Sequence, residues 1–456
     1  MRAATFDRCL SENPTSRRSV AIVVIACVAV IFDGFDMQAL AFTLPKLTEE
    51  WQISSVEAGM LASYTFVGLF AGAILLGAAG DRWGRKRMLA LGIVIFAVFS
   101  GTAGFAQSYE QFAALRVCAA LGMGGVLPTA ITMVTDYSPA ARRGRITALC
   151  GGCFTFGFVV AAVASRLIVP DYGWRPMFTA SYLALFIAVL VALVVPETPQ
   201  YLAARGRFEE AAATARRVFP AMRGPLETVE PARFFAADDG TRPAPTAGFR
   251  ALWGQQYRAT TVLVSVLYLC VQFAVYAMSF WMVTLLVKHG LSLASSYGYA
   301  IEQALAATLG GFAIGWFLDR MDRRTVLAVA FAVGGVSLIL FGFTTSVVAL
   351  YVLNALAGAL VIGGQNTVHS LVMDAYGVEA RGTGLGWALG IGRLGGLLGP
   401  LVGGFLLELN LAFPLYFVIF AVPAVLASAT TLALRAQHLR ATRMESSANG
   451  AVPAGV

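Results

Sequence analysis

The amino-acid sequence predicts an all-α polytopic membrane protein, in which twelve transmembrane helices form two pseudo-symmetric halves of six. The first observation behind this prediction is composition. Of the 456 residues, 58% are hydrophobic and 13% are charged, whereas an ordinary soluble protein carries about 25% charged residues. The other two observations are twelve separate apolar runs and a repeat that relates the second half of the chain to the first. The composition argues against both a soluble enzyme and a disordered chain.

Each apolar run is long enough to cross a membrane, for which a helix needs about 20 residues. The predicted spans are 19–44, 56–80, 88–107, 109–135, 144–168, 176–196, 259–287, 293–318, 324–344, 346–373, 381–407 and 411–434. Between the sixth and seventh spans, residues 197–258 hold clustered charge and proline. This stretch predicts a polar loop with a short amphipathic helix over 208–218.

The distribution of Lys and Arg predicts the orientation of the chain. Basic residues concentrate in both tails and in every even-numbered loop, which the positive-inside rule assigns to the cytoplasm. The exceptions on the outer side are Lys46, Arg166, Arg175 and Lys288. The net charge of +8 is therefore an orientation signal, and no nucleic-acid partner is expected. We expect a monomer in the cell inner (plasma) membrane, with the lipid bilayer around it and both termini in the cytoplasm.

These boundaries give five parts. They are a cytoplasmic N-terminal tail over 1–18, an N-terminal six-helix half over 19–196, a cytoplasmic central loop over 197–258, a C-terminal six-helix half over 259–434 and a cytoplasmic C-terminal tail over 435–456.

An internal repeat relates the two halves at a constant offset of 238 positions, as Gly77 and Gly315 illustrate. The other matched pairs are Asp81 with Asp319, Arg82 with Arg320, Arg85 with Arg323, Asp136 with Asp374, and Gly157 with Gly395. Paired six-helix halves are typical of secondary transporters, whose binding site lies between the halves near the bilayer midplane.

Three motifs carry a resemblance to a known family. The loop after the second span reads Gly77-Ala-Ala-Gly-Asp-Arg-Trp-Gly-Arg-Lys86, Arg116 lies in the fourth span, and Pro196-Glu-Thr-Pro199 follows the sixth. Together they resemble the major facilitator superfamily over essentially the whole chain. The resemblance implies alternating access and a cytoplasmic gate of charged residues. These are Asp81, Arg82, Arg85, Asp136, Asp319, Arg320, Arg323 and Asp374. A solvated positive-inside loop is the alternative reading of the arginines.

A narrower resemblance rests on the first and eleventh spans. They read Asp33-Gly-Phe-Asp36 and Gly390-Ile-Gly-Arg-Leu-Gly-Gly-Leu-Leu-Gly-Pro400, which is similar to the aromatic acid:proton symporter family. Two departures are Gly377, where the family usually has proline, and Gly396. The resemblance implies import of a small organic anion, an aromatic carboxylate such as 4-hydroxybenzoate, together with a proton and without a cofactor.

Five charged residues fall inside predicted spans, where each costs roughly 2.5–3.5 kcal/mol and indicates function. Asp33 and Asp36 share one face of the first helix. Two carboxylates this close cannot both ionise easily, so we predict that they couple proton movement. Asp36 and Arg116 lie at matched depth, and the alternative is a static buried ion pair between helices. Glu302 is a further proton-coupling candidate or a partner of Arg393.

Arg393 is predicted to receive the substrate carboxylate, because its planar guanidinium can donate two parallel hydrogen bonds. The alternatives are an ion pair with Glu302 or contact with a helix end. An aromatic anion also needs apolar walls and hydroxyl-binding groups. The remaining substrate-binding candidates are Arg116, Phe35, Tyr276, Gln365, Asn366 and Trp387.

Other functions fit the sequence less well. A drug antiporter usually carries a Gly-Pro motif in the fifth span, which this chain lacks. A symporter of an aliphatic or sugar acid would also suit Arg393 and stays open. A membrane-embedded enzyme would need a metal or nucleophile constellation, but the three histidines have no metal-ligand spacing. On that ground we expect neither catalysis nor a metal site. The chain also has no phosphate-binding GxxxxGK[ST] loop, so we expect an ion gradient and not ATP to drive transport.

Overall fold

The computed structural model describes residues 6, 9, 10, 16–235, 249–377 and 380–448. Over these residues twelve helices are long and apolar enough to cross a membrane. They run over Arg17–Trp51, Ser55–Gly80, Arg85–Ala103, Tyr109–Asp136, Gly144–Tyr172, Arg175–Val194, Arg258–Lys288, Leu293–Leu318, Arg323–Phe343, Val347–Ala375, Arg381–Glu408 and Phe413–Leu434. The prediction of a twelve-helix membrane protein is confirmed.

The chain divides into two compact units. Unit 1 comprises Met1–Pro243 and Leu291–Ile301, and unit 2 comprises Ala244–Gly290 and Glu302–Val456. The helices of unit 1 are α2 (Arg17–Trp51), α3 (Ser55–Trp83), α4 (Arg85–Ala103), α5 (Tyr109–Asp136), α6 (Ala140–Tyr172), α7 (Arg175–Thr179) and α8 (Ala184–Val194), with a 3₁₀ turn over Ala180–Leu183 between the last two. Those of unit 2 include α14 (Arg258–Lys288), α16 (Arg323–Phe343), α20 (Arg381–Glu408) and α21 (Phe413–Ala448). Helix α15 (Leu293–Leu318) contributes its start to unit 1 and the rest to unit 2.

Glycine contacts repeat between the two units at the offset found in the sequence. A Cβ on Gly157 of α6 would lie 2.4 Å from the carbonyl oxygen of Ile31 on α2. A Cβ on Gly395 of α20 would lie 2.2 Å from the carbonyl oxygen of Leu269 on α14. Both glycines therefore let two backbones touch, as small residues do in membrane helix pairs. Adding the repeat offset of 238 to Gly157 and Ile31 gives Gly395 and Leu269, so the two contacts are equivalent.

The tenth span is broken into segments. Helix α17 (Val347–Ala357) passes into a π-helical turn at Gly358–Ile362, then into α18 (Gly363–Gln365) and, after Asn366 and Thr367, into α19 (Val368–Ala375). Single π-turns occur frequently at functional sites. The break places two predicted substrate-binding residues, Gln365 and Asn366, where the helix is interrupted.

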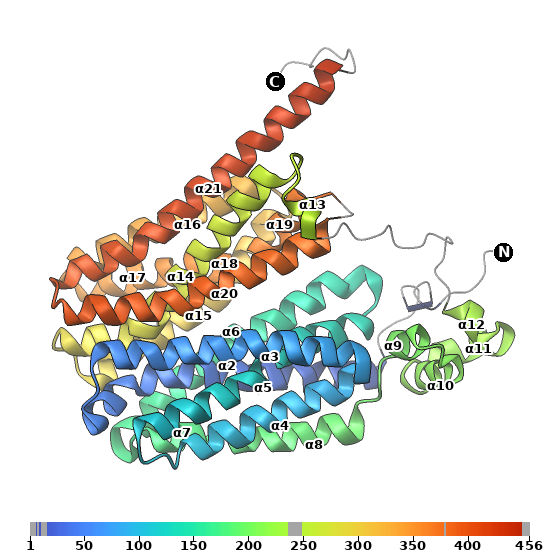
Figure 1. Ribbon diagram of the computed structural model, residues 1–456, viewed down its shortest axis with the longest axis horizontal. Helices are drawn as coiled ribbons and strands as arrows, with labels where there is room; N and C mark the ends of the chain where they lie inside the picture. The colour runs from blue at the N-terminus through green and yellow to red at the C-terminus, as the bar shows by residue number, and fades with distance from the viewer. Residues whose placement is uncertain (1–5, 7–8, 11–15, 236–248, 378–379, 449–456) are drawn as a thin grey trace. The chain divides into compact units, whose positions relative to one another are not determined.

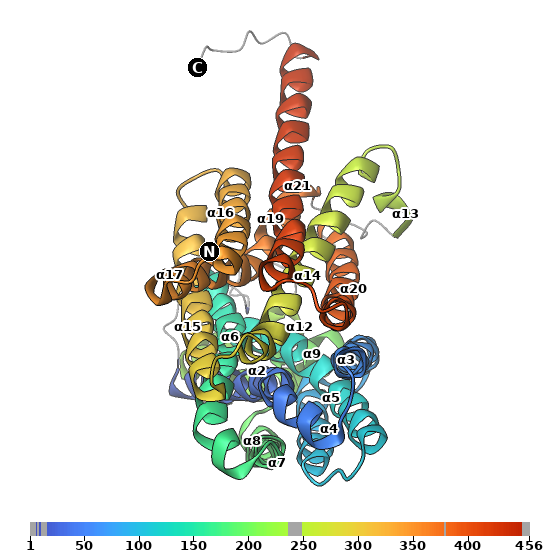
Figure 2. The same cartoon turned by 90° about the vertical axis from the view of Figure 1, so that its left-hand side faces the viewer.

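The polar loop after α8 folds into short helices at one end of unit 1 (Figure 1). They are α9 (Pro199–Ala204), α10 (Phe208–Val218), α11 (Arg223–Thr228) and α12 (Pro231–Phe234), and α10 coincides with the predicted amphipathic helix. Phe6 is buried among the rings of Phe219, Phe234 and Phe235. Phe6 is thus packed onto this group of helices. In unit 2, α21 continues as one helix past Leu434, where its span ends (Figure 2).

Candidate functional site

A buried ion pair joins two helices of unit 1. Arg116 on α5 donates from Nη1 to Oδ2 of Asp36 on α2 at 2.6 Å, and both side chains are 0% exposed. The second Nη of Arg116 lies 3.4 Å from the carbonyl oxygen of Asp36. The structure therefore brings together two residues for which the sequence predicted matched depth.

The carboxylate of Asp36 receives donors from three segments of the chain. Besides Arg116, Ser100 on α4 donates to its Oδ1, and Ser181 in the 3₁₀ turn donates to the same atom at 2.8 Å. The ring of Phe178 on α7 lies 5.3 Å from the Arg116 guanidinium carbon. A charge buried in this way is compensated on all sides, which favours the structural alternative for Asp36 and Arg116. The sequence analysis missed both serines, because serine is common in membrane helices and gives no distinctive signal.

Asp33 lies one turn before Asp36 on the same helix and is 2% exposed. Phe35 between them is also buried, and its backbone nitrogen lies 2.7 Å from the position of a Cβ on Gly157. Phe35 is thus placed at the close packing of α2 against α6. Asp33 and Asp36 form a pair of buried acids whose charges act on one another.

Unit 2 carries a different polar arrangement at the position equivalent to Arg116. Asn354 on α17 takes that position in the repeat and is buried. Its Nδ2 donates to Oε2 of Glu302 on α15 at 2.5 Å. Gln303 donates from Nε2 to Oδ1 of Asn354 at 2.8 Å. The structure therefore pairs Glu302 with a neutral amide.

Arg393 lies on α20 and is half-buried. The residue before it, Gly392, packs so closely on α14 that a Cβ there would lie 3.0 Å from the side chains of Gln272 and Tyr268. Tyr276, one turn after Gln272, is also half-buried on α14. Unit 2 thus offers a cation, an amide and a phenol on two neighbouring helices.

The other substrate-binding candidates of unit 2 differ in their surroundings. Gln365 is half-buried and Asn366 is exposed at the break of the tenth span. Trp387 on α20 donates from its indole nitrogen to Ser265 at 2.8 Å and packs edge-on against two further rings. These rings belong to Phe249 of the short helix α13 (Phe249–Leu252) and to Trp253. The structure gives Trp387 a packing role at this end of α20.

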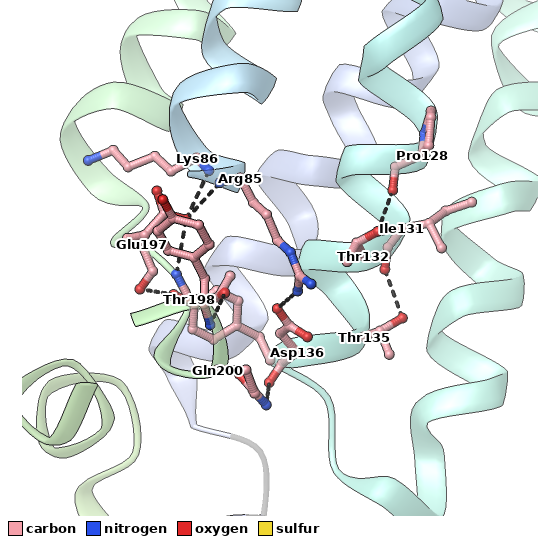
Figure 3. Close-up of polar contacts among 12 residues, drawn as sticks. Arg85, Lys86, Pro128, Ile131, Thr132, Thr135, Asp136, Glu197, Thr198 and Gln200 are labelled. Atoms are coloured by element: carbon pink, nitrogen blue, oxygen red, sulfur yellow. Dashed lines mark hydrogen bonds and ion pairs between the residues drawn. The ribbon is translucent and has the colours of Figure 1, made fainter. Parts of the chain in front are cut away.

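Two equivalent ion pairs lie at one end of each unit. Arg85 at the start of α4 contacts Asp136 at the end of α5, and Arg323 at the start of α16 donates to Asp374 on α19 at 2.7 Å. Figure 3 shows Arg85 extending toward Asp136. The structure therefore brings these four predicted gate residues together in two ion pairs.

The other four predicted gate residues do not join these pairs in the same way. The exposed guanidinium groups of Arg82 and Arg320 lie over the rings of Trp83 and Trp316. Asp319 is exposed, and the side chain of Asp81 lies outside the described residues.

Glu197 is a residue of this region to which the sequence analysis assigned no role. Its Oε1 accepts hydrogen bonds from the backbone nitrogens of Arg85 at 2.9 Å and Lys86 at 3.2 Å, at the N-terminus of α4 (Figure 3). A carboxylate is favourable there because the first amides of a helix point outward and carry partial positive charge. Glu197 thereby ties the segment after α8 to the junction of α3 and α4.

Tyr137, which follows α5, donates to the carbonyl oxygens of Pro196 at 3.0 Å and Glu197 at 3.2 Å. Burial raises the pKa of Tyr137 well above its usual range, and the charges of Glu197 and Asp136 raise it further. The hydroxyl therefore stays protonated and remains a donor. The motif Pro196-Glu-Thr-Pro199 was the signal that could have identified this contact.

We expect Glu197→Gln to lower the free energy of unfolding by about 1–2 kcal/mol, because an amide carries no charge to interact with the start of α4. Thermal unfolding of the detergent-solubilised protein measures this. Glu210→Gln is the matched control, since Glu210 is exposed and pairs with Arg207 within α10 and its cap. Equal melting temperatures for the two variants would contradict the role of Glu197.

Comparisons with known proteins agree with this architecture. A family profile for the Major Facilitator Superfamily matches residues 26–313 and 299–452. The chain is 29% identical to the benzoate transport protein of Acinetobacter baylyi, covering 92% of this chain and 90% of that protein. It is 30% identical to the gallate transporter of Pseudomonas putida, covering 95% of each. A solved structure of the xylose transporter XylE from E. coli matches the fold with a TM-score of 0.73 at 17% identity, covering 91% of this chain and 97% of that one.

Proposed function

The chain belongs to the major facilitator superfamily, and on that premise we propose that it imports an aromatic carboxylate by proton symport, through alternating access across the plasma membrane. The observation that carries the proposal is the likeness, over nearly the whole chain, to a benzoate and a gallate transporter. Benzoate and gallate share a benzene ring with a carboxylate and differ in their hydroxyl groups. The shared chemistry is therefore an aromatic anion.

Arg393 is the residue we propose for the carboxylate. It lies within the eleventh span on a helix whose glycines pack against α14, and a guanidinium holds a carboxylate through two parallel hydrogen bonds. Gln272, Tyr276, Gln365 and Asn366 supply amide and phenol groups in the same unit. Such groups would contact ring hydroxyls where the substrate has them.

Asp33 is the residue we propose for the proton. The charge of Asp36 is compensated by Arg116 and two serines, so we assign Asp36 to the packing of the helices. A second negative charge one turn away, at 2% exposure, is costly. Asp33 is therefore the acid of this pair that would take up and release the proton, while Asp36 and Arg116 hold α2 and α5 together.

The ion pairs Arg85–Asp136 and Arg323–Asp374 are proposed as parts of the cytoplasmic gate. Each lies within one unit and joins helix ends, so each can stabilise one conformation of its half. A gate residue should change the rate of transport more than substrate affinity, because it acts on the conformational equilibrium.

Uptake into proteoliposomes tests the function. Labelled benzoate and labelled gallate should accumulate when the lumen is more alkaline than the outside, and aromatic acids should compete better than aliphatic or sugar acids. Uptake that ignored the pH gradient would contradict proton symport. Equal competition by aliphatic acids would contradict the assignment of the substrate class.

We expect Arg393→Lys to raise the KM of uptake by about 10- to 100-fold, since losing a charge-assisted hydrogen bond costs about 1.5–3 kcal/mol. Lysine keeps the charge but lacks the planar pair of donors. Arg381→Lys is the control, because Arg381 is exposed at the start of the same helix. An unchanged KM in Arg393→Lys would show that the carboxylate binds elsewhere.

A further inference from the structure

We propose that Glu302, Asn354 and Gln303 form a second protonation site, at which Glu302 carries a proton and the two amides are positioning residues. The proposal rests on the proton symport proposed above. It adds a proton to the one assigned to Asp33, so that two protons accompany one anion.

The hydrogen bonds fix the orientation of this site. Gln303 donates to Oδ1 of Asn354 at 2.8 Å, so the other end of the Asn354 amide, its Nδ2, faces Oε2 of Glu302 at 2.5 Å. Both amides are buried, with Gln303 5% and Asn354 1% exposed. Gly358, where the π-turn begins, packs on Gln303 so closely that a Cβ there would lie 2.7 Å from its carbonyl oxygen. The broken tenth span therefore holds these three side chains in place.

The partner of Glu302 differs in kind from the partner of Asp36. In unit 1 the repeat position carries Arg116, whose charge is paired with the Asp36 carboxylate. In unit 2 the same position carries Asn354, which can donate to a carboxylate and to a protonated carboxyl group without supplying charge. An acid held by a neutral donor can change its protonation state without leaving a buried cation unpaired.

The second oxygen of Glu302 is the atom to which we assign the proton. Its Oε1 is buried and has no hydrogen-bond partner among the residues that the structure describes. An ionised carboxylate with one such oxygen is costly in this environment. The neutral acid, with the proton on Oε1 and with Asn354 on Oε2, removes that charge.

The titratable groups on the helices next to this site do not pair with Glu302. On α15, the neighbours of Glu302 are Tyr297 and Tyr299, and on α17 the titratable side chain is Tyr351. Tyr297 donates to the carbonyl oxygen of Phe42 on α2, the helix that carries Asp33 and Asp36. Helix α14, which packs on the π-turn, carries Tyr268, Cys270 and Tyr276. Among the described residues, the hydrogen-bond partner of the Glu302 carboxyl group is the neutral amide of Asn354.

Glu302→Gln separates proton movement from anion movement. In proteoliposomes with labelled benzoate, exchange of internal for external benzoate should stay within about twofold of the parent protein, because exchange needs no net proton flux. Accumulation in a pH gradient of one unit should fall about tenfold, which is the work that one proton supplies. With one proton fewer per anion, accumulation should also stop responding to an inside-negative membrane potential.

Asn354→Asp tests the positioning role through the pH profile. A second acid beside Glu302 should move the pH midpoint of uptake upward by about one unit, because like charges disfavour ionisation. Asn410→Asp is the control, since Asn410 is exposed just after the end of α20. The melting temperature of Glu302→Gln shows whether that variant folds. If it does not fold, Asn354→Asp still tests the proposal.

Three outcomes would overturn the inference. They are accumulation by folded Glu302→Gln equal to that of the parent protein, loss of exchange along with accumulation in that variant, and equal pH midpoints for the two aspartate variants. If the parent protein itself ignores the pH gradient, the proposed symport fails. If the parent protein responds to the pH gradient and the variants respond in the same way, the second protonation site fails and the proposed symport stands.

Discussion

Asp33→Asn is expected to reduce the accumulation of benzoate about tenfold for each unit of pH gradient, while exchange across the membrane continues. The estimate follows because one pH unit on one proton is worth about 1.4 kcal/mol, which is a factor of ten in concentration. Asparagine has nearly the shape of aspartic acid, so the neutral amide imitates the protonated state. The variant should therefore still move substrate, without the work that this one proton supplies.

The measurement compares gradient-driven uptake with benzoate exchange in the same proteoliposomes. Asp36→Asn is the matched control, one turn away on the same face of α2. Because Asp36 balances Arg116, this control should lower the melting temperature, whereas Asp33→Asn should not. Full accumulation by Asp33→Asn would show that the proton travels elsewhere. Loss of exchange would show that Asp33 binds the substrate or supports the fold.

The sequence was sufficient to predict the membrane helices and the paired halves. Hydrophobic length determines a span almost by itself, because unpaired backbone groups are not tolerated in lipid. The sequence repeat also predicted equivalent contacts in the two units. Arg85–Asp136 and Arg323–Asp374 recur as ion pairs, and Gly157 and Gly395 meet equivalent backbone atoms.

The parts that sequence reasoning missed depend on side chains that carry no distinctive pattern. Ser100 and Ser181 resemble many small residues of membrane helices, yet both donate to Asp36. The π-turn over Gly358–Ile362 reads as an uninterrupted apolar run. Asn354 carries no charge that would draw attention to it in the sequence, and its contact with Glu302 requires knowledge of how α15 and α17 pack.

Arg116→Met should cause the largest loss of stability, because it leaves Asp36 buried without its cation. Breaking a buried ion pair from one side costs about 3–5 kcal/mol, which corresponds to a fall in melting temperature of about 3–5 °C for a protein of this size. The serines that remain, Ser100 and Ser181, supply dipoles but no charge. Thermal unfolding in detergent, at a pH well above the range in which exposed carboxyls titrate, measures the effect.

The double variant Asp36→Leu with Arg116→Met distinguishes a structural pair from a substrate site. Replacing both partners of a buried ion pair by apolar residues is often neutral, so most of the lost stability should return. If Arg116 serves only to join α5 to α2, benzoate exchange should return with it. If Arg116 binds the substrate, as the sequence also suggested, the double variant should fold and yet fail to bind benzoate. A double variant no more stable than Arg116→Met would instead show that the serine and arginine contacts cannot be replaced by packing alone.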